Sequence, residues 1–103
     1  MSEPQISNRS AAVTITPSVI AREQLNGVRT FISITNTSIA GQIVYISTGA
    51  EAKVGVGIPL SPGGFFQDSQ DSDVLPSQAQ YTAISDALLA TVAIQERTIT
   101  GEL

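Results

Sequence analysis

The sequence predicts an all-β protein, a small antiparallel β-sandwich of about seven strands with an Ig-like or jelly-roll-like arrangement. Three observations lead to this prediction. Apolar and polar residues alternate over several short stretches, as they do in strands that bury one face. Turn-forming residues separate these stretches at intervals of roughly 8–12 residues, a spacing typical of sandwiches and barrels. No stretch carries the long apolar stripe, with a period of about 3.6 residues, that marks a helix.

The composition supports a single folded domain. The chain has 103 residues, of which 42% are hydrophobic and only 14% are charged. Disordered chains have the opposite balance, and independent folding units cluster near ~100–150 residues. Residues 11–99 are therefore expected to form one β-sandwich domain. Residues 1–10 and 100–103 show no periodicity, and we expect them to be a polar N-terminal arm and a C-terminal tail.

Segments 12–16 and 28–35 are the first predicted strands, and the second of them is the stronger. Its two faces are expected to carry Val28, Ile32 and Ile34 on one side and Arg29, Phe31, Ser33 and Thr35 on the other. Segment 18–25, between the two strands, has two interpretations. It is either a short helix with an N-cap at its first residue or an extended segment that leads into an Asn26-Gly27 hairpin. We favour the extended form because its apolar residues form no helical stripe.

The second half of the chain supplies predicted strands at 42–47, 53–58, 81–85 and 91–98, with a shorter strand or loop at 64–66. Alternation places Val44 and Ile46 on one face of the first of these, and Val92 and Ile94 inward in the last. A type II turn is expected at Pro62-Gly63, because proline presets φ at its first central position and glycine supplies the positive φ at the next.

Several classes of chemistry are excluded or disfavoured by the composition. The chain has no Cys and no His, so disulfides, Cys-based metal sites and His-dependent catalytic triads cannot be built from it alone. Its net charge is −4, and its five basic residues are scattered. No nucleic-acid partner is therefore expected. The most apolar stretch, 87–94, is far shorter than the ~20 residues that span a bilayer, so no membrane partner is expected either.

Two sets of carboxylates are the only candidates for a chemical site. The oxygens of Asp68, Asp71 and Asp73 could ligate Ca²⁺, but the EF-hand pattern is missing, and a solvated loop is the favoured interpretation. Glu51 and Glu96 could be proposed as an acid/base pair. Nothing in their spacing brings them together, and both are expected near strand ends, facing water. The sequence therefore predicts no catalytic residue, metal ligand or cofactor, and no enzymatic activity.

The aromatic residues indicate where a partner would bind. Two predicted strands carry large apolar residues on both faces, which is unusual for a solvated monomer. One sheet is therefore expected to be covered by another subunit. The candidate interface residues are Arg29, Phe31, Tyr45, Phe65 and Phe66. For each of them the alternative is ordinary packing in the core.

The order of five short motifs resembles that of small virion proteins and fibre domains of tailed bacteriophages. The motifs are RTFISITNTS at 29–38, IVYIS at 43–47, GIPLSPG at 57–63, YTAI at 81–84 and VAIQE at 92–96. The resemblance implies a non-enzymatic β-sandwich located in the virion. Such a protein is expected to be a capsid cement or decoration subunit, often a homotrimer, whose partners are copies of itself and the major capsid protein.

Two alternatives to a capsid cement role remain open. One is a vertex, head-fibre or tail attachment module, which would occur in fewer copies per particle. The other is a carbohydrate-binding or cell-surface-binding domain, because sugar sites favour exposed aromatic residues with flanking carboxylates. The candidates for such a site are Tyr45, Tyr81 and the acidic residues between 68 and 73.

Overall fold

The computed structural model describes residues 4–25, 27–39, 41–72, 74–87 and 89–100. These residues form eight strands and no helix, which confirms the predicted all-β class. The strands are β1 (Pro4–Val13), β2 (Ser18–Ala21), β3 (Gly27–Asn36), β4 (Val44–Thr48), β5 (Ile58–Leu60), β6 (Phe65–Ser69), β7 (Tyr81–Ser85) and β8 (Ala90–Thr100).

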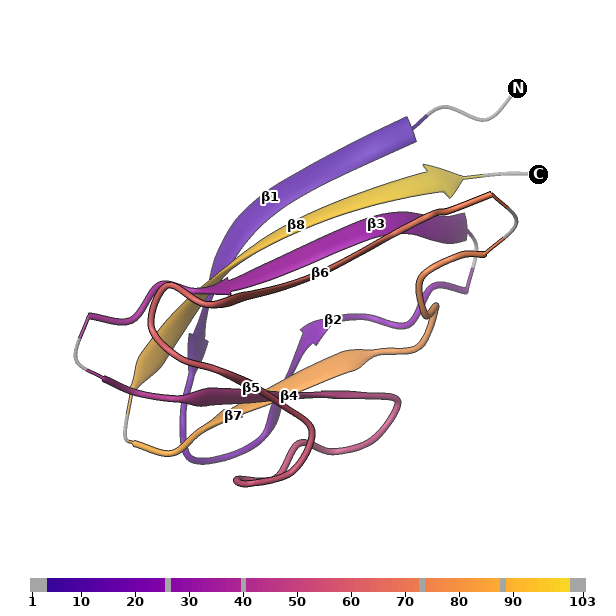
Figure 1. Ribbon diagram of the computed structural model, residues 1–103. Helices are drawn as coiled ribbons and strands as arrows, with labels where there is room; N and C mark the ends of the chain where they lie inside the picture. The colour runs from indigo at the N-terminus through magenta and orange to yellow at the C-terminus, as the bar shows by residue number, and fades with distance from the viewer. Residues whose placement is uncertain (1–3, 26, 40, 73, 88, 101–103) are drawn as a thin grey trace.

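The strands form two four-stranded sheets, packed as the two layers of a sandwich (Figure 1). The first sheet has the order β1-β8-β3-β6, and the second has the order β2-β7-β4-β5. Strands pair antiparallel from the outside of the sequence inward, β1 with β8, β2 with β7, β3 with β6 and β4 with β5. This nested pairing, divided between two sheets, is the topology of a jelly roll. It decides between the two arrangements that the sequence left open.

The first strand begins earlier than the alternation of apolar residues indicates. β1 pairs with β8 without interruption from Pro4 to Val13, so residues 4–10 belong to the sandwich. The prediction of an N-terminal arm at 1–10 is therefore wrong over that range. The inward-facing side chains of this part of β1 include Ser7 and Arg9, which make polar contacts in place of apolar ones. The sequence of this part therefore shows no alternation of apolar and polar residues. Thr100 likewise closes β8, and residues 1–3 and 101–103 lie outside the described part of the chain.

The strand predicted at 12–16 is wrong beyond Val13, where β1 ends, and Ile15 is exposed rather than inward. The other strand predictions are mostly confirmed. Segment 18–25 is extended rather than helical where β2 forms, but β2 and β3 lie in different sheets and make no hairpin. The prediction of a strand at 53–58 is wrong, since regular pairing begins only with β5. Gly55 and Gly57 in this stretch have φ angles of 84° and 92°, which are incompatible with an extended strand.

The core lies between the inner faces of the two sheets. Val44 and Ile46 from the second sheet and Val92 and Ile94 from the first are buried, as the alternation predicts. β7 is buried along its whole length, because the outer side of the second sheet is also covered there. The hydroxyl of Thr82, for example, donates a hydrogen bond of 2.6 Å to the carbonyl of Ala50 in the segment that follows β4.

Candidate functional site

A β-bulge in β3 turns Arg29 toward the interior. In β3, Arg29 pairs with Thr98 of β8, and Phe31 pairs with the preceding β8 residue, Arg97. One extra residue of β3 therefore lies between Arg29 and Phe31. Arg29 consequently shares the inner face with Ile32 and Ile34, and it is 0% exposed. The prediction that Arg29 is an interface residue on the outer face is therefore wrong, because the bulge reverses the direction of this side chain.

The buried guanidinium group of Arg29 is surrounded by hydrogen-bond acceptors. Its Nε donates to Oε2 of Glu96 at 2.8 Å. Its two Nη atoms donate to the main-chain carbonyls of Arg22, Ser77 and Ala79 at 2.6–3.0 Å. The guanidinium carbon also lies 5.0 Å from the centre of the Tyr81 ring, within the range of a cation–π interaction.

Arg9 holds the other oxygen of the same carboxylate. Its Nη2 lies 2.5 Å from Oε1 of Glu96 and 2.8 Å from the carbonyl oxygen of Ile20. Glu96 is thus bound between two guanidinium groups, with a side chain that is 8% exposed. The expectation that Glu96 faces water at a strand end is wrong, because it lies on the inward side of β8. Glu51, in contrast, is exposed in the segment after β4.

We call Arg9, Arg29 and Glu96 the ionic cluster. Its charged residues come from the first sheet, while the carbonyls of Ile20, Ser77 and Ala79 belong to β2 and to the segment before β7 in the second sheet. The hydrogen bonds therefore join the two sheets at one end of the sandwich. A buried ion pair of this kind tolerates the loss of a partner poorly, since the remaining charge is left unpaired. We infer that the ionic cluster is structural.

Burial in the same region affects Tyr81. Removal from water raises the pKa of the Tyr81 hydroxyl above its ordinary value of 10.0. The positive charge of Arg29 opposes this rise in pKa, and the charges of Asp68 and Glu96 add to it. Tyr81 is 1% exposed in the core, so it is not available for the sugar-binding role considered from the sequence.

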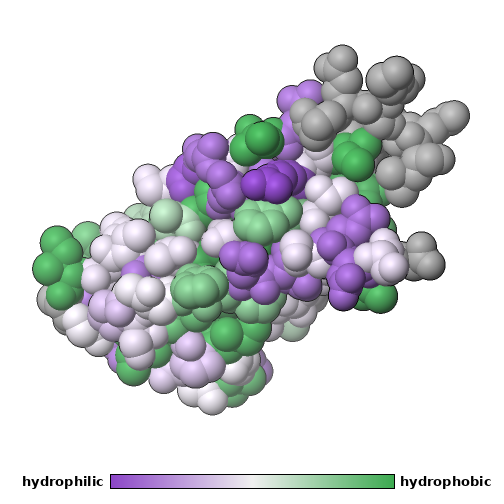
Figure 2. Space-filling view, turned by 45° about the horizontal axis from the view of Figure 1, so that its top comes forward, coloured by the Kyte–Doolittle hydropathy of each residue, from purple (hydrophilic) through white to green (hydrophobic). Residues whose placement is uncertain are grey.

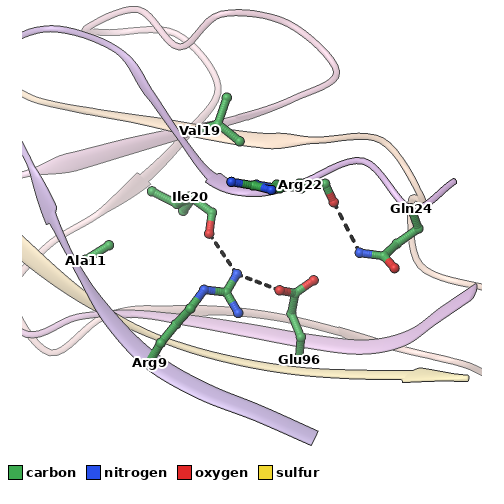
Figure 3. A pocket seen from close by; sticks show the side chains of 7 residues that line it. All are labelled: Arg9, Ala11, Val19, Ile20, Arg22, Gln24 and Glu96. Carbon is green, nitrogen blue, oxygen red and sulfur yellow. Dashed lines mark hydrogen bonds and ion pairs between the residues drawn. The ribbon is translucent and has the colours of Figure 1, made fainter. Parts of the chain in front are cut away.

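A cleft lies beside the ionic cluster, between the edge strands β1 and β2 (Figure 3). Its volume is about 430 Å³. The lining residues combine three charged side chains with small apolar ones: Arg9, Ala11, Val19, Ile20, Arg22, Gln24 and Glu96. The described part of the chain therefore offers a polar, open cleft here, next to a carboxylate whose two oxygens already accept hydrogen bonds.

The outer face of the first sheet is nearly free of charge. Strand pairing aligns its outward residues in three rows across β1, β8, β3 and β6, and all twelve are exposed or half-buried. We call this set the charge-poor face: Ile6, Asn8, Ser10, Phe31, Ser33, Thr35, Phe65, Gln67, Ser69, Ala93, Gln95 and Arg97. Only Arg97 in this set is charged, and its guanidinium carbon lies 4.8 Å from the centre of the Phe31 ring. Figure 2 turns this side of the molecule forward, and purple, white and green side chains are mixed over it.

The five candidate interface residues are distributed over three places. Phe31 and Phe65 lie on the charge-poor face, and Phe65 is 64% exposed. Tyr45 is half-buried on β4, on the outer side of the second sheet. Phe66 points inward, packs against the core and lies 6.0 Å from Tyr81 between ring centres, so its prediction as an interface residue is wrong. The cause is strand parity, since Phe65 and its neighbour point to opposite faces.

The predicted acidic cluster is not assembled by the described residues. Asp68 lies in β6 opposite Ile32, and Asp71 forms an isolated bridge with Val74. Asp73 lies outside the described residues. Within the described ranges, no three acidic side chains come close enough together to hold a metal ion.

Comparisons with known proteins identify no relative: no family model and no curated protein sequence matches the chain. Within the residues that the structure covers, no helix is long and apolar enough to cross a membrane.

Proposed function

We propose that the chain is a non-enzymatic structural protein of a virion. It acts as a capsid cement or decoration subunit that binds a phage head by surface contacts and assembles as a homotrimer. Its partners are copies of itself and the major capsid protein. The structural observation that supports this proposal most directly is the charge-poor face, a sheet surface on which one residue of twelve is charged.

The chemistry of the charge-poor face suits a protein partner. Charged residues are depleted in the cores of protein interfaces because their desolvation is costly, whereas aromatic residues are enriched there. Eleven of the twelve residues on this face are uncharged, and the amide groups of Asn8 and Gln95 already hydrogen-bond to each other at 2.7 Å. Docking of a shell therefore requires little desolvation of charge and leaves donors and acceptors for new hydrogen bonds.

The whole outer side of the first sheet is somewhat smaller than one side of a standard interface. Three strands of about ten residues and one of about five, spaced ~4.8 Å apart, cover roughly 550 Å² before side-chain relief is counted. A standard interface buries ~800 Å² on each partner. Jelly rolls also occur in lectins and cupins, so the fold alone does not select a virion role. The order of motifs that resembles phage virion proteins is the reason for choosing it.

The copy number of the chain in purified virions tests the proposal. A cement or decoration subunit is expected in proportion to the major capsid protein, and quantitative mass spectrometry of the particles measures this ratio. A far smaller number of copies would instead identify a vertex, head-fibre or tail module. Absence from the particles would overturn the virion role.

Binding of the isolated protein to capsid shells tests the face itself. Ser33 lies at the centre of the charge-poor face, so Ser33→Glu introduces an unpaired charge that docking must desolvate. We expect shell binding to weaken at least about tenfold, since unpaired buried charge is costly. Thr48→Glu, at an exposed position of the second sheet, is the matched control and should bind normally. Equal binding by the two variants would exclude this face.

A further inference from the structure

Positive charge is concentrated around the cleft between β1 and β2. Three of the five basic residues of a chain with net charge −4 are gathered there, Arg9 and Arg22 in its lining and Arg29 behind it. Among the described residues, the ion pairs of these arginines involve one carboxylate, that of Glu96, whose two oxygens are taken by Arg9 and Arg29. The lining itself holds two arginines and this one carboxylate, so its charged side chains sum to a net positive charge.

Arg22 is the side chain with spare binding capacity. Its main-chain carbonyl accepts hydrogen bonds from Arg29 at 2.7 Å and from Gln24 at 3.3 Å, which fix the backbone at this residue. Within the described residues its guanidinium group makes no hydrogen bond or ion pair with another side chain. Arg9 uses three of the five N–H donors of its guanidinium group. Both side chains line the cleft and retain donors for a bound anion (Figure 3).

The remaining walls of the cleft fit a peptide. Ala11 and Val19 supply an apolar surface beside the two arginines. β1 and β2 are the outer strands of their sheets, paired only with β8 and β7, so each has one edge without a strand partner among the described residues. An extended peptide can hydrogen-bond to such an edge while its side chains fill neighbouring pockets. The volume of about 430 Å³ is large enough for two or three side chains.

We propose that this cleft binds an acidic segment of a partner protein, with an Asp or Glu carboxylate between Arg9 and Arg22 and an aliphatic neighbour against Ala11 and Val19. Arginine recognises carboxylates through paired, charge-assisted hydrogen bonds. A free phosphate would also be attracted by the positive charge of the cleft. Unlike a peptide, it would leave the apolar wall and the strand edges unused.

The inference is independent of the virion role, because the cleft and the charge-poor face have no residue in common. A titration followed by NMR tests it on the full chain. The probe is a capped Val-Glu-Val peptide, compared with capped Val-Gln-Val and with inorganic phosphate. We expect saturable shifts of the side-chain Nε–Hε signals of Arg9 and Arg22 with the glutamate peptide, and an affinity that decreases as salt is added.

Two charge-matched variants locate the site. Arg22→Gln should fold normally, because its guanidinium group makes no described contact, and should weaken binding of the glutamate peptide roughly tenfold or more. Arg97→Gln removes the same charge on the charge-poor face and should leave the affinity unchanged. Three results would each overturn the proposal. The chain could bind the glutamine peptide as tightly as the glutamate peptide, or Arg22→Gln could bind the glutamate peptide as tightly as the unchanged chain. The third is binding of phosphate without binding of the glutamate peptide.

Discussion

The guanidinium group of Arg29 makes four side-chain hydrogen bonds, to one carboxylate and three main-chain carbonyls. Arg29→Leu would remove the side-chain donor to the carbonyls of Ser77 and Ala79 and leave Glu96 with one cation fewer. We expect a loss of roughly 3–5 kcal/mol in the free energy of unfolding, measured by urea denaturation. Arg29→Lys should also be destabilising, because a single ammonium group cannot reproduce the planar fork.

Arg97→Gln is the matched control for this experiment. Arg97 is exposed and contacts the ring of Phe31, an interaction that contributes only ~0.5–1 kcal/mol at an exposed site. Its replacement should therefore change stability by no more than that amount. Similar losses for Arg29→Leu and Arg97→Gln would show that the ionic cluster does not stabilise the junction of the sheets.

Tyr81 gives a prediction about pH. Burial raises its pKa in the folded protein above the ordinary value of 10.0. The folded state therefore holds the phenol proton more tightly than the unfolded state. The contribution of Tyr81 to stability is therefore fully present below pH 10.0. It is lost as the pH rises from there through the pKa of Tyr81 in the folded protein. Urea unfolding on both sides of this pH measures the effect.

A Tyr81→Phe variant should lose the Tyr81 part of this alkaline decrease. Tyr45→Phe separates the two tyrosines, since its tyrosinate absorbance reports Tyr81 alone. The absorbance of this variant should rise with a midpoint above pH 10.0. A midpoint at or below that pH would contradict the raised pKa.

The ionic cluster depends on two inward side chains, Glu96 and Arg29, and the sequence indicated the direction of the first of them only. The parity that predicted inward Val92 and Ile94 also places Glu96 inward, and a buried carboxylate requires a cationic partner. The direction of Arg29 was not predictable in this way. It depends on a bulge formed by pairing with a strand about 67 residues away, as the contact to Glu96 shows.

Among the elements, the stretch between β4 and β5 depends on glycine. Gly57 has a φ of 92°, and a Cβ atom at this position would lie 2.4 Å from the carbonyl oxygen of Ile46, closer than real contacts allow. We expect Gly57→Ala to destabilise the protein by at least about 3 kcal/mol, because backbone strain and a steric clash combine. Thermal or urea unfolding measures this loss.

Gly41→Ala separates the two causes. Gly41 also has a positive φ, 74°, but a Cβ atom added there would have nothing within 4 Å of it. This variant should show only the conformational cost, about 1–2 kcal/mol. If Gly57→Ala costs no more than Gly41→Ala, the close approach to Ile46 does not constrain the fold.

Alternation alone located most of the strands. The predicted segments 28–35, 81–85 and 91–98 coincide with or lie within β3, β7 and β8, and 42–47 overlaps β4. It failed where another interaction replaces apolar burial. The first half of β1 is held by pairing with β8 and by polar contacts of Arg9. The stretch 53–58 contains alternating valines, but the positive φ angles of its glycines turn the chain away from a strand.

At the scale of the whole molecule, the arrangement of the sheets was the least predictable feature. Ig-like and jelly-roll-like sandwiches use similar strands, and they differ in which strands pair over long distances. Here the pairing of β1 with β8 places both ends of the described chain in the first sheet. The outer side of that sheet forms the charge-poor face, which takes residues from all four strands. The pattern of a single strand therefore does not predict it.

The oligomeric state is a prediction that concerns the molecule as a whole. The proposed homotrimer should have three times the chain mass of 10.8 kDa in size-exclusion chromatography with light scattering. Assembly would bury apolar side chains that are exposed in the single chain, such as Phe65. Identical subunits commonly assemble with closed rotational symmetry. Its radius of gyration in small-angle scattering should exceed the 13.7 Å of the single chain. A monomer at all concentrations that also fails to bind capsid shells would contradict both the trimer and the cement role.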